Sequence, residues 1–298
     1  MANAQVDYFS FASTIDLLKG DDIKGISIRD LEIIKENRVK LAKKLNISLA
    51  EIILKNNWYI YNEEYYYYKR LDSAFRIMNE LIGVYLSKYM GVPTVEYTLA
   101  LDFGKIVGLL SKNFRKLKKR YYLATCVNSK YLKKFSNSLN EPIVDELRKS
   151  LDRLIMKDFY SCMTDRVRNT LVSMTRLKNV SLETSFDYEM SFIDERDSLY
   201  PRFEKDETHE FDRYFNPLFY NDDEDKSYGE INYDTLKGMM EYDEYLIYLF
   251  ERIMDFDITK AIKCIEEENG MVVADDLKNY YINFDKIRKD ELSRNLRK

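Results

Sequence analysis

Five side chains of the types that can move a phosphoryl group occur in a fixed order along this chain. Lys69 closes a tyrosine-rich segment that is typical of a strand, where its ammonium could bind nucleotide phosphates. Glu80 follows on a helical segment and could hold that ammonium in place. Asp165 could orient a hydroxyl group and accept its proton. Asn169 and Asp187 could supply the oxygen ligands that Mg²⁺ prefers, so the set indicates phosphoryl transfer from a nucleotide.

The elements that must position Lys69 and Glu80 lie in the first 113 residues. Residues 58–62 and 65–70 are rich in aromatic side chains and predict two strands joined by a tight turn at Asn62-Glu63-Glu64. Residues 74–90 are apolar around most of a helical wheel and predict a buried helix. The exception is one narrow sector, formed by Arg76, Glu80, Gly83 and Ser87. We expect a small mixed sheet that packs against this helix.

Two further segments complete the first part of the chain. Residues 28–45 place apolar side chains at helical spacing and predict an amphipathic helix. Residues 94–101 and 105–111 predict strands on either side of Asp102-Phe103-Gly104. Although these three letters resemble a metal-binding motif, Asp and Gly between two strands are ordinary turn formers, and we interpret them as a hairpin turn.

The second part of the chain is mainly helical. Residues 143–162 predict a long helix, and residues 170–174 and 180–183 predict a short hairpin that separates Asn169 from Asp187. Helical spacing returns over residues 235–256, 258–269 and 276–298. These segments predict an α+β chain in which Asp165 and Asn169 occupy the loop after the long helix.

Four segments of the sequence resemble the HipA-like serine/threonine kinases, especially the short stand-alone bacterial members. They are YYYYKR (65–70), MNELIGVYLSKYMGVPTVEYTL (78–99), MTDRVRNTLVSM (163–174) and FDYEMSF (186–192). The resemblance covers roughly residues 57–192. It implies a bilobal protein-kinase-like fold with a small mixed β-sheet N-lobe and a mainly helical C-lobe. We place the N-lobe, with an N-terminal helical extension, at residues 1–113 and the C-lobe at residues 114–298.

The same resemblance implies an activity and assigns a role to each candidate residue. The reaction would be ATP-dependent phosphorylation of serine or threonine in a protein substrate, with autophosphorylation, and the cofactors would be ATP and Mg²⁺. Asp165 would be the catalytic carboxylate. Lys69 would bind the nucleotide phosphates with Glu80 as its ion-pair partner, and Asn169 and Asp187 would be the metal ligands.

Two features of the sequence keep other functions open. Only three residues separate Asp165 from Asn169, where this family normally has four, and Val167 replaces the usual His. No glycine occurs between Gly25 and Gly83, so no glycine-rich loop can cover the phosphates. A kinase-like pseudoenzyme that acts as a binding or regulatory module is therefore one alternative. A small-molecule kinase on the same fold is another.

Charge suggests which partners to expect. The chain has 47 Lys and Arg against 51 Asp and Glu, a formal net charge of -4, so it lacks the overall positive charge that favours nucleic acid. Residues 103–140 nevertheless contain ten Lys and Arg and no Asp or Glu. This basic segment could bind an acidic partner, or it could simply be a solvated surface.

Counts of rare residues exclude several mechanisms and indicate a compartment. The one histidine, His209, lies in an acidic run with no positioned partner, which argues against His-dependent hydrolysis. The three cysteines are odd in number and scattered, which is typical of a reducing compartment. No apolar run is long enough to span a membrane. We expect a cytoplasmic protein.

Overall fold

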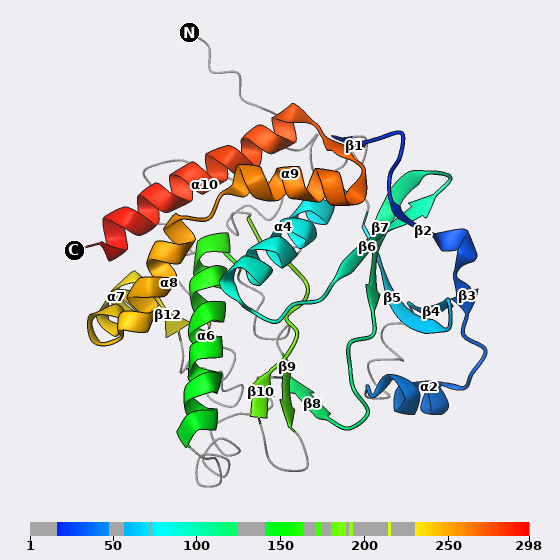
Figure 1. Ribbon diagram of the computed structural model, residues 1–298, viewed down its shortest axis with the longest axis horizontal. Helices are drawn as coiled ribbons and strands as arrows, with labels where there is room; N and C mark the ends of the chain where they lie inside the picture. Colours follow the sequence, from blue (N-terminus) through cyan, green and yellow to red (C-terminus); the bar gives the residue numbers. More distant parts are fainter. Residues whose placement is uncertain are drawn as a thin grey trace.

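The computed structural model describes residues 17–47, 57–71, 73–123, 141–163, 171–174, 180–188, 191–192, 214–215 and 230–297. A β-sheet lies on one side of the molecule and most of the helices lie on the other (Figure 1). Helix α4 (Ala74–Met90) lies between them and contacts both parts.

The larger sheet is mixed, as the sequence predicts. Its strands are β2 (Gly25–Ser27), β3 (Glu32–Ile33), β4 (Trp58–Tyr61), β5 (Glu64–Arg70), β6 (Tyr97–Asp102) and β7 (Lys105–Lys112). They are arranged in the order β2-β6-β7-β5-β4-β3. Only the β2–β6 pair is parallel among the pairs of this sheet.

Two tight turns connect the antiparallel strands. Asn62 and Glu63 join β4 to β5 with φ angles of 48° and 65°, and Phe103 and Gly104 join β6 to β7 with φ angles of 48° and 77°. Two consecutive positive φ angles are what a two-residue hairpin of this hand requires. The prediction that Asp102-Phe103-Gly104 is a hairpin turn is confirmed.

The register of the sheet decides which side chains can reach the helices. Lys69 pairs with Leu109, and Leu109 pairs with Leu99 on the next strand, so all three side chains share one face. Leu99 and Leu109 pack into the same core as α4. Tyr66 and Tyr68 point to the opposite face. The face that carries Lys69 is therefore the one covered by α4.

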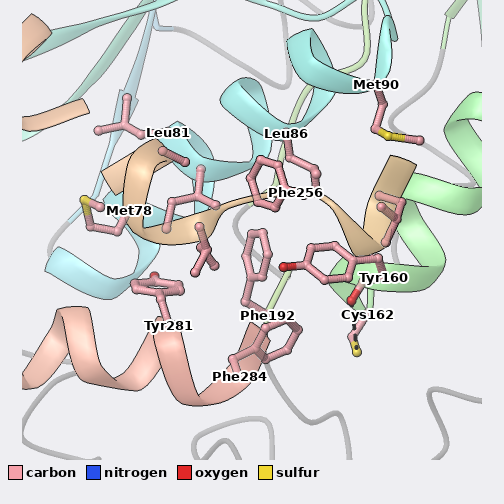
Figure 2. Close-up of a cluster of buried hydrophobic side chains, with 14 of the residues drawn as sticks. Met78, Leu81, Leu86, Met90, Tyr160, Cys162, Phe192, Phe256, Tyr281 and Phe284 are labelled. Atoms are coloured by element: carbon pink, nitrogen blue, oxygen red, sulfur yellow. Dashed lines mark hydrogen bonds between the residues drawn. The ribbon is translucent and has the colours of Figure 1, made fainter. Parts of the chain in front are cut away.

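Helix α4 has the bounds that the sequence predicts, and its ends explain why. The side chain of Ser73 accepts a hydrogen bond from the Arg76 N–H and caps the first turn. Gly91 adopts the left-handed conformation that ends the helix, with a φ of 71°. Figure 2 shows Met78, Leu81, Leu86 and Met90 of this helix in one apolar cluster with aromatic side chains from other elements: Tyr160, Phe192, Phe256, Tyr281 and Phe284.

The predicted helix over residues 28–45 is wrong in its first half. Residues Ile28–Asp30 form a short 3₁₀ helix, residues 32–33 form β3, and only Arg38–Leu45 form helix α2. Leu31 has an extended backbone, and Asn37 caps α2 by accepting a hydrogen bond from the Lys40 N–H. The pairing of β3 with β4 stabilises the extended backbone here, so the sheet overrides the apolar periodicity.

The C-terminal part contains the remaining long helices. They are α6 (Glu141–Ser161), α7 (Tyr233–Tyr242), α8 (Glu244–Met254), α9 (Ile258–Asn269) and α10 (Asp275–Leu296). The helical pattern of residues 235–256 divides at Asp243, whose extended backbone ends α7 and whose side chain caps α8. The long helix predicted over residues 143–162 is confirmed as α6.

The remaining strands are short. Strands β8 (Arg120–Leu123), β9 (Leu171–Met174) and β10 (Val180–Leu182) form a three-stranded sheet, which confirms the predicted hairpin. Two further pairs join β1 (Leu18–Lys19) to β13 (Val272–Val273), and β11 (Tyr214–Phe215) to β12 (Glu230–Ile231).

The larger sheet lies wholly before residue 113 and α6 to α10 wholly after it, although α4 shares its core with the later helices. The lobe boundary at residue 113 stays a prediction. Among the residues that the structure describes, no helix is both long and apolar enough to cross a membrane.

Candidate active site

Lys69 lies near the end of β5 and contacts two carboxylates, one from eleven residues later in the chain and one from 118 residues later. Its Nζ donates hydrogen bonds to Glu80 Oε1, from α4, and to Asp187 Oδ1 at 2.5 Å. The side chain of Glu80 is fully buried, that of Lys69 is 18% exposed and that of Asp187 is 36% exposed. The site therefore opens to solvent on the side of Asp187.

Glu80 is the buried end of this ion-pair network. Its second oxygen, Oε2, accepts a hydrogen bond from the Tyr188 N–H at 2.9 Å. Burial raises the pKa of the Glu80 carboxyl, while the positive charge of Lys69 acts in the opposite direction. Glu80 thus holds both the lysine of β5 and the backbone that follows Asp187.

The polar sector of α4 has a function that the sequence alone did not reveal. Glu80, Gly83 and Ser87 are all buried, and they face the segment that contains Asp187 and Tyr188. A Cβ atom on Gly83 would lie 2.4 Å from Cγ of Tyr188, so only glycine fits beneath this ring. Spacing of three and four residues puts these positions on one side of the helix.

Tyr188 anchors the segment through its hydroxyl group. The hydroxyl oxygen lies 3.1 Å from Ser87 Oγ and 2.7 Å from Thr94 Oγ1, and the residue is fully buried. Asp187, immediately before it, has a φ of 63°, a conformation that Asp tolerates better than most residues. The buried ring therefore fixes the backbone from which the Asp187 carboxylate projects toward Lys69.

Backbone hydrogen bonds attach this segment to the turn after α4. Ser185 N–H donates to the Pro93 carbonyl at 2.8 Å, and Val95 N–H donates to the Ser185 carbonyl at 3.0 Å. Thr94 and Ser185 also form a parallel β-bridge. The segment that carries Asp187 is therefore hydrogen-bonded to residues 93–95, which follow α4 in the chain.

A buried lysine on α6 lies beneath the ring of Tyr188. Lys157 Nζ is 4.2 Å from the ring centroid and forms an ion pair of 2.7 Å with Asp158. Both side chains are fully buried. The sequence analysis did not identify Lys157, Tyr188 or Thr94 as part of the site. For Lys157 the reason is that helical spacing does not show that a lysine faces inward. The glycine and serine in the polar sector of a buried helix were the available signal for the Tyr188 contact.

Aromatic side chains lie beside Lys69 on the same face of the sheet. Tyr67 precedes Lys69 by two positions and packs edge-on against Trp58, with ring centroids 5.4 Å apart. Burial raises the pKa of the Tyr67 hydroxyl. Glu64, by contrast, pairs with Lys112 at 2.8 Å, and β5 alternation places it on the face opposite Lys69. Its carboxylate does not face the ammonium.

Asp165 and Asn169 lie outside the described residues. The structure describes α6 as far as Ser161 and the chain as far as Met163, and then resumes at Leu171, the first residue of β9. The part of the chain with described positions contains no group of three or more His, Cys, Asp and Glu side chains that could hold a metal ion. Asp187 offers one carboxylate, a ligand type that fits Mg²⁺.

The features of this site define a kinase-like α+β fold. A mixed sheet presents a lysine to a glutamate of one buried helix. A helical part follows, and an aspartate comes after a hairpin. The chain aligns with HipA of Shewanella oneidensis MR-1, solved as a complex of that toxin–antitoxin system's HipA and HipB with operator DNA. The alignment covers 89% of this chain and 72% of that chain, with a TM-score of 0.51 and 13% sequence identity.

The chain also aligns with a second solved structure. The proinflammatory kinase CtkA of Helicobacter pylori matches over 78% of this chain and 89% of that chain, with a TM-score of 0.46 and 15% identity. No protein-family model and no curated protein sequence matches the chain. The alignment with HipA shows that this chain has a HipA-like kinase fold, and the predicted fold class is confirmed.

Proposed function

We propose that this protein is an ATP-dependent kinase that phosphorylates serine or threonine in a protein substrate and also phosphorylates itself. The observation that supports this most strongly is the placement of the Lys69 ammonium between Glu80 and Asp187. A partly buried lysine between two carboxylates from separate segments serves no sheet or helix pairing, whereas it suits a site for nucleotide phosphates.

Each side chain has a distinct part in this proposal. Lys69 binds the phosphates, and Glu80 keeps its ammonium directed into the site. Asp187 is a ligand of Mg²⁺, with Asn169 as the second ligand, and the ion neutralises phosphate charge when it is bound. Asp165 orients the acceptor hydroxyl and accepts its proton.

The test is phosphate transfer from labelled ATP, located by mass spectrometry. We expect phosphoserine or phosphothreonine on the protein itself and on protein substrates in the presence of Mg²⁺. Lys69→Met should abolish transfer. Lys112→Met is the matched control, because Lys112 lies on the adjacent strand with a 53% exposed side chain and points to the opposite face. Equal transfer by wild type and Lys69→Met would contradict the proposal.

A kinase-like pseudoenzyme is the second candidate, and two features of the sequence favour it. Only three residues separate Asp165 from Asn169, and glycine is absent from residues 26–82. A pseudoenzyme would bind Mg-ATP without transferring phosphate to itself, to proteins or to small molecules. Mg-ATP binding without any phosphate transfer would therefore support the pseudoenzyme.

A further inference from the structure

Two basic segments that are far apart in the sequence lie side by side in the structure. The amide of Asn46, at the C-terminal end of α2, donates hydrogen bonds to the carbonyls of Lys116 and Lys119 at 2.9 and 2.8 Å. The amide of Asn113 donates to the carbonyl of Leu45 at 3.2 Å. Helix α2 is thus attached at its C-terminal end to the linker between β7 and β8.

These contacts build one surface with a strong excess of positive charge, which we call the α2–linker surface. Its basic residues come from α2, from the linker and from the first position of β8: Arg38, Lys40, Lys43, Lys44, Arg115, Lys116, Lys118, Lys119 and Arg120. Over residues 34–47 and 113–121 the sequence has one acidic residue, Glu36, which pairs with Lys44. Glu183 pairs with Lys119 at 2.5 Å. The concentration of charge is unexpected in a chain whose formal net charge is -4.

Apolar side chains are exposed among these charges. Leu117, between two lysines, is 73% exposed, and Val39, on α2, is 52% exposed. Lysine and arginine alone would be an ordinary solvated surface. Leucine and valine left open within the same cluster add apolar area that a partner can cover.

The combination distinguishes between classes of partner. A nucleic-acid backbone would neutralise the charges but offers no aliphatic group to cover Leu117 and Val39. A protein segment with acidic and aliphatic side chains can satisfy both features. We propose that the α2–linker surface binds an acidic, leucine-containing segment of a partner protein. Helix α2 has eight residues and is about 12 Å long, so an extended segment of about four residues would span the helix. A longer segment would also reach the linker.

The experiment measures binding by fluorescence anisotropy at low salt. The probe is a labelled ten-residue peptide of alternating glutamate and leucine, compared with an alternating glutamate–serine peptide. A single-stranded oligonucleotide and vesicles that contain phosphatidylserine are tested in parallel. We expect the glutamate–leucine peptide to bind most tightly. Its affinity should fall at 0.5 M salt, because the Debye length at that concentration is only about 4 Å and surface charges are then strongly screened.

Variants locate the binding surface. Lys40→Glu, Lys116→Glu and Lys118→Glu are combined, because all three side chains are exposed and Glu is favoured at the third position of a helix such as α2. The control combines Lys260→Glu, Lys263→Glu and Lys286→Glu, which make the same change of charge on exposed positions of α9 and α10. We expect at least a tenfold loss of peptide affinity in the first variant and less than a twofold change in the control.

Leu117→Ser tests the apolar part of the surface separately. It should remove most of the preference for the leucine peptide over the serine peptide while leaving the affinity for the serine peptide unchanged. Equal losses in the two triple variants would overturn the proposal, because binding would then follow net charge alone. Tighter binding of the oligonucleotide or of the vesicles would overturn the assigned partner. Neither readout depends on phosphate transfer, so the failure of the proposed kinase activity would leave this test intact.

Discussion

Replacing Gly83 with alanine should destabilise the protein, although the same change in most helices does the opposite. Alanine in the interior of a helix is favoured over glycine by about 0.5–1 kcal/mol. At Gly83, however, the new Cβ would lie 2.4 Å from Cγ and 2.5 Å from Cβ of Tyr188. Overpacking of this kind costs about 1–3 kcal/mol. We expect a net loss of about 0–2.5 kcal/mol of unfolding free energy, together with displacement of Tyr188.

The matched control is Gly238→Ala in α7. No heavy atom lies within 4 Å of a Cβ built at Gly238, so this variant should gain the full helix propensity of about 0.5–1 kcal/mol. Chemical denaturation of both variants gives the two free energies, which should differ by about 1–3 kcal/mol. Because Tyr188 holds the backbone of Asp187, Gly83→Ala should also weaken Mg-ATP binding, and Gly238→Ala should not.

Two results would each refute a part of this reasoning. If Gly83→Ala were as stable as Gly238→Ala, the ring of Tyr188 could not lie against α4 as described. If Gly83→Ala were destabilised but bound Mg-ATP as tightly as wild type, the contact would be structural only, and Tyr188 would not position Asp187. Chemical denaturation tests the first outcome, and calorimetric titration with ATP and Mg²⁺ tests the second.

Three further predictions concern the site and its surroundings. Asp165→Asn should lower the rate of phosphate transfer by about 10²-fold in single-turnover assays while leaving Mg-ATP affinity unchanged. A folded variant with the wild-type rate would contradict the catalytic role of Asp165. Tyr188→Phe removes a hydroxyl that contacts Ser87 and Thr94. Their own hydroxyls can still donate to the carbonyls of Gly83 and Ser185, so the variant should cost about 0.5–1.5 kcal/mol in denaturation measurements, the scale of a lost hydrogen bond. Burial alone would raise the pKa of Glu183, but hydrogen bonds from Lys119, Ser173 and Ser181 lower it overall. Its contribution to stability is therefore complete above its unfolded pKa and is lost as the pH falls through the lowered folded pKa, so Glu183→Gln should reduce the acid sensitivity of the melting temperature.

The sequence predicted the parts of the fold that local patterns determine. Helix α4 and the two hairpin turns follow from apolar spacing and from residues that tolerate positive φ, so their bounds are found in the structure nearly unchanged. The helix expected over residues 28–45 failed because β3 pairs with β4, a partner beyond any local pattern. Long-range pairing of this kind overrides periodicity in a short segment.

The site could be predicted as a set of residue types, but not as a geometry. The order of Lys69, Glu80 and Asp187 along the chain indicated which side chains to examine, and the structure brings these three together. The contact of Tyr188 with Gly83 joins residues more than a hundred positions apart, and only packing of α4 against the later segment reveals it. The buried Lys157 was hidden for the same reason, since a lysine on an amphipathic helix normally faces water.

Calorimetric titration of the purified protein with ATP, in the presence and absence of Mg²⁺, tests the central claim most directly. If Lys69, Glu80 and Asp187 form a nucleotide site, wild type should bind ATP with Mg²⁺, and Lys69→Met and Asp187→Asn should each weaken that binding at least tenfold while Lys112→Met retains it. Because an active kinase and an inactive kinase-like module both require this site, the result does not depend on turnover. The absence of binding by folded wild-type protein to any nucleotide with any divalent metal would contradict the account.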